Sequence, residues 1–175
     1  MIYLLIFFVL LGLELLYFKV ANKFNIIDKP NERSSHTRVT LRGGGVVFYM
    51  GALLYFILSK GSYSFFILGL TIIGAISFVD DIKSVSRKTR LLVQFAAMGL
   101  MFHELGLFTD FPLWYLLVAL IFFTGITNAY NFMDGINGIT GGYSLVVLGA
   151  LYYINQTVTP FTDPSFLITM ILAVL

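Results

Sequence analysis

The sequence predicts an all-α fold, a polytopic bundle of transmembrane helices. Of its 175 residues, 58% are hydrophobic and only 11% are charged, whereas soluble domains carry about 25% charge. The apolar residues also gather into long runs, and most basic residues lie in two of the segments between these runs. Low charge with long apolar runs is typical of a membrane protein. The chain has no cysteine, which excludes a disulfide framework and a thiolate metal site.

Six apolar runs are candidates for complete membrane spans, which need about 20 residues, with about 17 as the lower limit. A seventh begins near Ser165 and reaches Leu175 after eleven residues, too few to cross a bilayer. The six runs are Ile2–Val20, Gly43–Leu58, Ser64–Val79, Leu91–Leu107, Phe111–Thr127 and Ile139–Asn155. We expect six complete spans and a truncated seventh, forming one integral membrane domain (residues 1–175) that is the N-terminal portion of a longer protein.

The first run, Ile2–Val20, has the position of a secretory signal but not its pattern. No basic segment precedes it, it is longer than the apolar core of a signal peptide, and no small-residue cleavage site follows it. We predict that it remains as an anchor. The second run begins at three consecutive glycines, and the third ends at the paired carboxylates Asp80 and Asp81.

The basic residues predict how the spans are oriented. All of the eleven Lys and Arg residues except Lys60 lie around two loops, Asn22–Arg42 and Asp80–Arg90. Because cytoplasmic loops carry an excess of Lys and Arg, both loops are expected in the cytoplasm and the N-terminus outside. Counting spans then places Asn128–Gly138 on the cytoplasmic side too, so three hydrophilic segments are expected at one membrane face.

The segment "FVDDIKSVSRKTR", Phe78–Arg90, is the first candidate for chemistry. An ionised side chain costs about 2.5–3.5 kcal/mol at the bilayer centre. The cost is smaller at the interface, but adjacent carboxylates still repel each other unless a divalent cation or nearby Lys and Arg relieve them. The alternative is an ordinary helix end with charges facing water. For the Asp80–Asp81 pair with the basic run after it, the functional interpretation is favoured.

The segment "NAYNFMDGINGITGG" repeats a polar residue at every third position, at Asn128, Asn131, Asp134 and Asn137. Residues three apart are neighbours on a helix face, and the glycines that follow allow close approach to a ligand. Asn and Asp supply the oxygen ligands that Mg²⁺ prefers, and the donors and acceptors that a base or sugar needs. The alternative is a polar turn between helices.

The segment "DKPNERSSHTRVTLRGGG", Asp28–Gly45, offers Arg33, Arg38 and Arg42, whose guanidinium groups suit phosphates. A basic loop that only sets topology explains this segment equally well. Together the three segments predict a cytoplasm-facing site at the membrane surface. Its carboxylates, amide oxygens, cations and glycines match phosphates with Mg²⁺, and a substrate carried in lipid would explain its position.

In this order, the three segments resemble motifs of the polyprenyl-phosphate N-acetylhexosamine-1-phosphate transferase family, also called glycosyltransferase family 4. The bacterial O-antigen or capsule initiators are the most similar type, judged by "NERSSH" and "NFMDG". The resemblance implies transfer of a sugar 1-phosphate from a UDP-sugar to undecaprenyl phosphate, with release of UMP. It implies Mg²⁺ as cofactor, the bacterial inner membrane as location and a lipopolysaccharide or other cell-surface polysaccharide as product. It implies no nucleic-acid partner and leaves a homodimer open.

The resemblance also assigns roles to residues. Asp80 and Asp81 match the acidic pair, implied to be catalytic, and Asn131 matches a contact to Mg²⁺. A second metal ligand is expected in the C-terminal part of a transferase of roughly ten spans, so a chain ending at Leu175 is expected to be inactive. Substrate binding is implied for Asn128, Asp134, Asn137, Arg33, Arg42 and Arg90.

The sequence departs from the family pattern in two places, and two other classes of protein are alternatives. Val39 and Leu41 stand where many members have prolines, and Asn137 stands where many bacterial members have aspartate. The enzymatic rival is an intramembrane prenyltransferase of the aspartate-rich type, although "DDIKS" and "NFMDG" lack its DxxxD spacing. The non-enzymatic rival is a transporter half or membrane scaffold, but transporters tend to place polar groups near the bilayer midplane.

Overall fold

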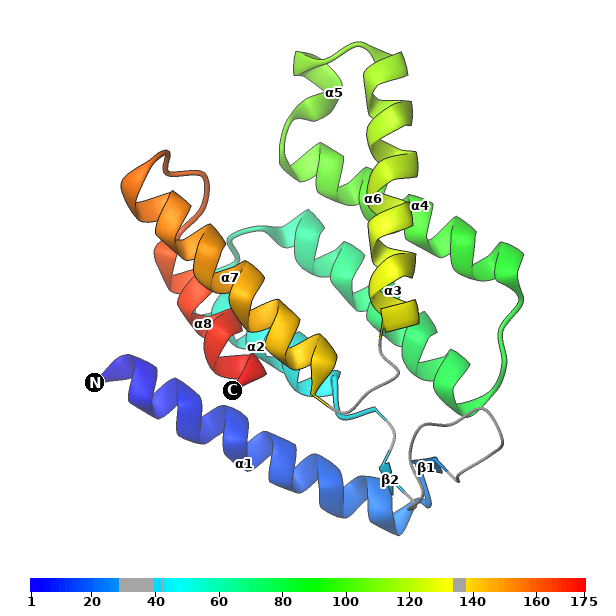
Figure 1. The fold of residues 1–175 in the computed structure, drawn as a ribbon, viewed down its shortest axis with the longest axis vertical. Coiled ribbons are helices and arrows are strands. Elements are labelled where there is room, and N and C mark those ends of the chain that lie inside the picture. Colours follow the sequence, from blue (N-terminus) through cyan, green and yellow to red (C-terminus); the bar gives the residue numbers. More distant parts are fainter. Residues whose placement is uncertain (29–39, 42, 134–137) are drawn as a thin grey trace. The chain divides into compact units, whose positions relative to one another are not determined.

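The structure is a computed structural model that describes residues 1–28, 40–41, 43–133 and 138–175. The predicted all-α class is confirmed, because most of these residues are helical (Figure 1). The helices are α1 (Ile2–Lys23), α2 (Val46–Leu58), α3 (Ser64–Ile82), α4 (Arg87–Glu104), α5 (Leu107–Asp110), α6 (Leu113–Met133), α7 (Ile139–Thr157) and α8 (Pro164–Val174).

Each of the seven apolar runs corresponds to one helix, and the largest differences are at helix ends. α4 begins four residues before its apolar run, at Arg87, and α6 continues past Thr127 to Met133. The sequence did not predict α5 or the antiparallel pair of β1 (Ile27–Asp28) and β2 (Thr40–Leu41). Among the described residues, α1 and α6 are long and apolar enough to cross a membrane. The six complete spans and truncated seventh stay a prediction.

The described chain divides into two compact units, Met1–Leu58 with Met133–Leu175, and Ser59–Phe132. In the first unit, α8 packs against α1, α2 and α7 (Figure 1). The core of this unit is made by Ile6 and Leu10 of α1, Val47 of α2 and Ala173 of α8. The short helix α8 is therefore a central element of its unit. The predicted single membrane domain stays a prediction.

A polar cluster fixes the start of α8. The side-chain oxygen of Asn155, which is only 4% exposed, accepts a hydrogen bond from the backbone N–H of Thr162 at 3.0 Å. Asp163 caps the helix by accepting from the N–H of Ser165 at 2.8 Å, and it accepts from the Tyr55 hydroxyl at 2.8 Å. The Ser165 N–H, followed by the Tyr55 hydroxyl, lowers the pKa of Asp163 against the opposing effect of burial.

Gly51 of α2 lies where α8 approaches most closely. A Cβ atom at Gly51 would be 2.7 Å from the Cβ of Ala173. Overpacking of this kind costs about 1–3 kcal/mol, so Gly51→Ala should lower the free energy of unfolding by this amount in detergent. Adding Ala173→Gly removes the clash and should restore most of it, giving a coupled double-mutant cycle. Gly12→Ala, with open space at the same atom, is the control, and an equal effect at both glycines would contradict the packing.

In the second unit, α3 and α4 pack side by side (Figure 1). A Cβ at Gly69 would lie 3.0 Å from the backbone oxygen of Ala97, so the two helices approach closely there. Small residues allow such approach between membrane helices. Glu104 at the end of α4 accepts hydrogen bonds from the N–H groups of Phe65 at 2.6 Å and Phe66 at 3.3 Å. Its carboxylate therefore caps the N-terminus of α3, where a negative charge is stabilising.

Candidate functional site

Asp80 lies in the last turn of α3, and both of its carboxylate oxygens have partners. Oδ1 accepts a hydrogen bond from the backbone N–H of Val85 at 2.7 Å. Oδ2 forms an ion pair with the guanidinium of Arg90 at 3.0 Å. Arg90 lies in the first turn of α4, which is capped by Ser86 accepting from the N–H of Thr89 at 3.1 Å. The structure therefore brings together two predicted site residues, and Asp80 fixes the turn that joins their helices.

The Asp80–Arg90 pair remains accessible to a ligand. The Arg90 side chain is 31% exposed and that of Asp80 is 23% exposed. A partly exposed ion pair contributes only about 0–1 kcal/mol to stability, so stability alone is a weak reason for it. A guanidinium has five N–H donors, and one ion pair leaves donors that can bind a phosphate. Asp80 thus holds Arg90 in a position where it can receive an anion.

Asn128 and Asn131 lie on neighbouring positions of one face of α6, one turn apart. The amide of Asn128 exchanges two hydrogen bonds with the amide of Gln94 on α4, at 3.3 and 3.2 Å. It also donates to the backbone oxygen of Thr124 at 2.9 Å. Asn131, in contrast, is exposed in the last turn of α6. The Asn128 amide is therefore engaged in hydrogen bonds between and within α4 and α6, while the Asn131 side chain is accessible to a ligand.

The side chains of the remaining predicted site residues lie outside the described part of the structure. Asp81 lies on α3 next to Asp80, but its side chain is outside the described part of the structure. The predicted residues that lie outside the described ranges altogether are Arg33, Arg42, Asp134 and Asn137. Their roles, like the predicted gathering of three motifs at one face, stay predictions.

The fit of the side chains to Mg²⁺ depends on Asn131. Among the residues that the structure describes, no group of three or more His, Asp or Glu side chains could hold a metal. Mg²⁺ is often bound by one or two protein oxygens, together with waters and substrate phosphates. The exposed amide oxygen of Asn131 fits such a role, whereas both carboxylate oxygens of Asp80 already have partners. Of the predicted site residues whose side chains the structure describes, Asn131 is thus the one whose oxygen fits Mg²⁺.

Sequence reasoning missed Gln94 and Thr124. Gln94 is only 7% exposed and Thr124 only 5%, and no described residue makes a hydrogen bond with the Thr124 hydroxyl. Gln94 had a signal in the sequence, because it is the one amide in the apolar run Leu91–Leu107. Thr124 lies four residues before Asn128 on α6, so both belong to the same stripe of the helix.

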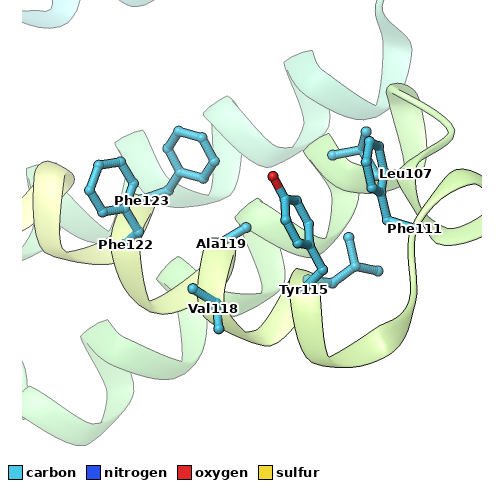
Figure 2. A pocket seen from close by; sticks show the side chains of 8 residues that line it. Leu107, Phe111, Tyr115, Val118, Ala119, Phe122 and Phe123 are labelled. Atoms are coloured by element: carbon cyan, nitrogen blue, oxygen red, sulfur yellow. The ribbon is translucent and has the colours of Figure 1, made fainter.

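A hollow of about 390 Å³ lies in the second unit, lined by residues of α5, α6 and the segment between them (Figure 2). Of the side chains drawn in Figure 2, only Tyr115 carries a polar group, and Phe111, Phe122 and Phe123 supply large apolar surfaces. This lining offers no cation or carboxylate for a phosphate substrate. The hollow therefore lacks the predicted site residues, of which the structure describes the side chains of Asp80, Arg90, Asn128 and Asn131.

Comparison with known proteins identifies related sequences. The profile of "Glycosyl transferase family 4" matches residues 63–175. A Yersinia pestis protein named undecaprenyl-phosphate alpha-N-acetylglucosaminyl 1-phosphate transferase is 33% identical over 76% of this chain and 40% of its own length. A probable transferase of that kind from Bacillus subtilis is 27% identical over 76% of this chain and 41% of its own.

A more distant type of relative is the phospho-N-acetylmuramoyl-pentapeptide-transferase of Thermotoga neapolitana, 30% identical over 63% of this chain and 41% of its own length. The chain thus spans about two fifths of the length of these curated relatives. No solved structure matches the chain significantly.

Proposed function

The chain belongs to glycosyl transferase family 4, as its three motifs predicted, and from this we propose that the protein transfers a sugar 1-phosphate from a UDP-sugar to undecaprenyl phosphate. The donor sugar is of the N-acetylhexosamine type, and UMP is released. The single observation that supports this most directly is the accessible Asp80–Arg90 pair. It presents a cation to which a phosphate can bind. Relatives in Yersinia pestis and Bacillus subtilis are named undecaprenyl-phosphate N-acetylglucosaminyl 1-phosphate transferases, the second as a probable one.

In the proposed reaction, an oxygen of the lipid phosphate attacks the sugar-linked phosphorus of the UDP-sugar. A new phosphorus–oxygen bond forms, the bond to the leaving UMP breaks, and the lipid then carries a pyrophosphate-linked sugar. Arg90 binds the lipid phosphate, Asp80 holds Arg90 in place, and Asp81 orients or deprotonates the acceptor. Asn131 would hold Mg²⁺, which would neutralise charge on the donor pyrophosphate. Positioning and charge neutralisation of this kind dominate phosphoryl transfer.

The proposed setting is the cytoplasmic face of the bacterial inner membrane, where the product begins a cell-surface polysaccharide such as an O-antigen. Six complete spans with the N-terminus outside place the loop after α3 and the end of α6 on this face. The two helices that meet the length and composition of a span and the basic loops support this arrangement. The lipid acceptor would then reach the site without leaving the membrane.

The orientation can be tested by labelling, since the chain contains no cysteine. Ser35→Cys lies in the first basic loop and should react with a membrane-impermeant maleimide only after the cells are permeabilised. Ser62→Cys, in the exposed segment between α2 and α3, should react in intact cells. The reverse pattern of labelling would contradict the proposed topology.

The activity itself requires a direct assay of the complete polypeptide. Membranes that contain it should convert labelled UDP-N-acetylglucosamine and undecaprenyl phosphate into a labelled lipid and UMP when Mg²⁺ is present. Chelation of Mg²⁺ should stop the reaction, and membranes without the protein are the control. Failure to form a lipid-linked product with any UDP-N-acetylhexosamine donor would count against the proposed function.

A further inference from the structure

We infer that Gln94 is a positioning residue for the proposed transfer: its buried amide pairs with Asn128 and so sets the register between α4, which carries Arg90, and α6, which carries Asn131. The inference rests on the proposed function and deepens it. Gln94 itself is given no contact with substrate. Its role is to act through the two helices that it joins.

The geometry of the pair is well suited to fix a register. Each amide donates to the other, at 3.3 Å from Gln94 to Asn128 and at 3.2 Å in the return direction. Asn128 uses its second N–H to reach the oxygen of Thr124, one turn earlier on its own helix. Three hydrogen bonds therefore hold the Asn128 side chain, and a slip of one helix along the other would break the reciprocal pair.

The position of the pair connects it to both candidate ligand-binding residues. Arg90 precedes Gln94 by four residues on α4, and Asn131 follows Asn128 by three residues on α6. Residues at these spacings lie on one face of their helix. The pair therefore lies one turn from Arg90 on one helix and one turn from Asn131 on the other.

Stability alone explains this pair poorly. Hydrogen bonds between membrane helices contribute only about 0.6 kcal/mol on average, and well-packed apolar side chains can replace buried polar groups at little cost. Thr124, whose backbone oxygen accepts from Asn128, also has a buried hydroxyl with no hydrogen-bond partner among the described residues. A buried amide that selects one register is the best-supported use of such groups.

The test compares three variants of the complete polypeptide. Gln94→Leu keeps a similar volume but removes the pair, and it should lower kcat by about 10- to 100-fold, as small misplacements of reacting groups do. KM for both substrates should change little, whereas the free energy of unfolding should fall by the roughly 1–3 kcal/mol that one unsatisfied buried amide costs, so kcat is compared per amount of folded protein. The double variant Gln94→Asn with Asn128→Gln preserves two amides and their combined length, and it should recover most of kcat. Gln156→Leu, at an exposed glutamine of α7, is the matched control.

Several results would overturn the inference. One is a kcat for Gln94→Leu within about twofold of the parent. Another is a loss of kcat that follows a parallel loss of folded protein, which indicates a structural role only. A third is failure of the swapped pair to recover activity, which would show that restoring the reciprocal amide pair does not restore the reaction. An inactive parent protein would instead refute the proposed function.

A cross-linking experiment tests the contact between Gln94 and Asn128 independently of whether the protein is a transferase. The chain has no cysteine, so Gln94→Cys combined with Asn128→Cys introduces two defined thiols. A short bifunctional thiol reagent should join them, which limited proteolysis between α4 and α6 would reveal. Gln94→Cys with Phe122→Cys, at an exposed residue of α6, is the control pair. Equal cross-linking of both pairs would overturn the register that the inference requires.

Discussion

Replacing Asp80 with asparagine should reduce sugar-phosphate transfer by about 100-fold, the loss expected when a group that binds substrate is displaced by about 1 Å. Asparagine keeps an oxygen that can accept from the Val85 N–H, so the turn between α3 and α4 should persist. It loses the charge that holds the Arg90 guanidinium at 3.0 Å. The measurement is the initial rate of lipid-linked sugar formation per amount of folded protein in detergent.

Arg90 allows the role of Asp80 to be dissected. If Asp80 acts by positioning Arg90, then Asp80→Asn combined with Arg90→Ala should be no slower than the slower single variant. Asp110→Asn, an exposed carboxylate in α5, is the matched control and should retain full activity. Multiplicative losses in the double variant would show that Asp80 and Arg90 act independently. Full activity of Asp80→Asn would refute the assignment of Asp80 to the reaction.

The apolar runs predicted the helices well. A helix that is apolar on every side can be recognised from a continuous apolar run, without a periodic pattern of apolar and polar residues. The ends were less predictable. α4 begins at Arg87 because Ser86 caps it, and this cap lies in a charged segment that hydropathy assigns to a loop. The pairing of Ile27 with Leu41 depends on a contact between residues distant in sequence, which local pattern does not reveal.

The sequence likewise predicted some residues of the candidate site and missed others. Asp80 and Arg90 were both predicted, and their contact follows from a short turn between two helices. Gln94 was missed because the sequence does not show which residue a single amide in an apolar run contacts. The structure shows that its partner is Asn128, 34 residues later on α6. For Asn131 the threefold spacing placed the residue on the helix face correctly, since α6 continues to Met133. The sequence could not predict that Asn128 and Asn131 have different surroundings.

Replacing Asn131 with alanine should have the second large effect, because it removes the proposed oxygen ligand of Mg²⁺ in the last turn of α6. We expect the rate to fall by at least about 10- to 100-fold, because loss of a group that only supports a metal ligand already has an effect of this size. The Mg²⁺ concentration that gives half-maximal rate should rise as well. Asn131→Asp, which keeps an oxygen ligand and adds charge, should restore activity at low Mg²⁺. Asn22→Ala, at an exposed asparagine of α1, is the control.

The binding of the ion can be measured apart from turnover. Mn²⁺ substitutes for Mg²⁺ at oxygen sites, and its electron paramagnetic resonance signal reports the fraction bound when UDP is present. Asn131→Ala should weaken Mn²⁺ binding in the presence of UDP, whereas Gln94→Leu should weaken it less, because Gln94 acts only through the helix. An unchanged metal requirement in Asn131→Ala would refute the metal role. It would direct attention to the exposed amide as a ligand for the donor itself, since an amide can donate to a phosphate or sugar as readily as it accepts.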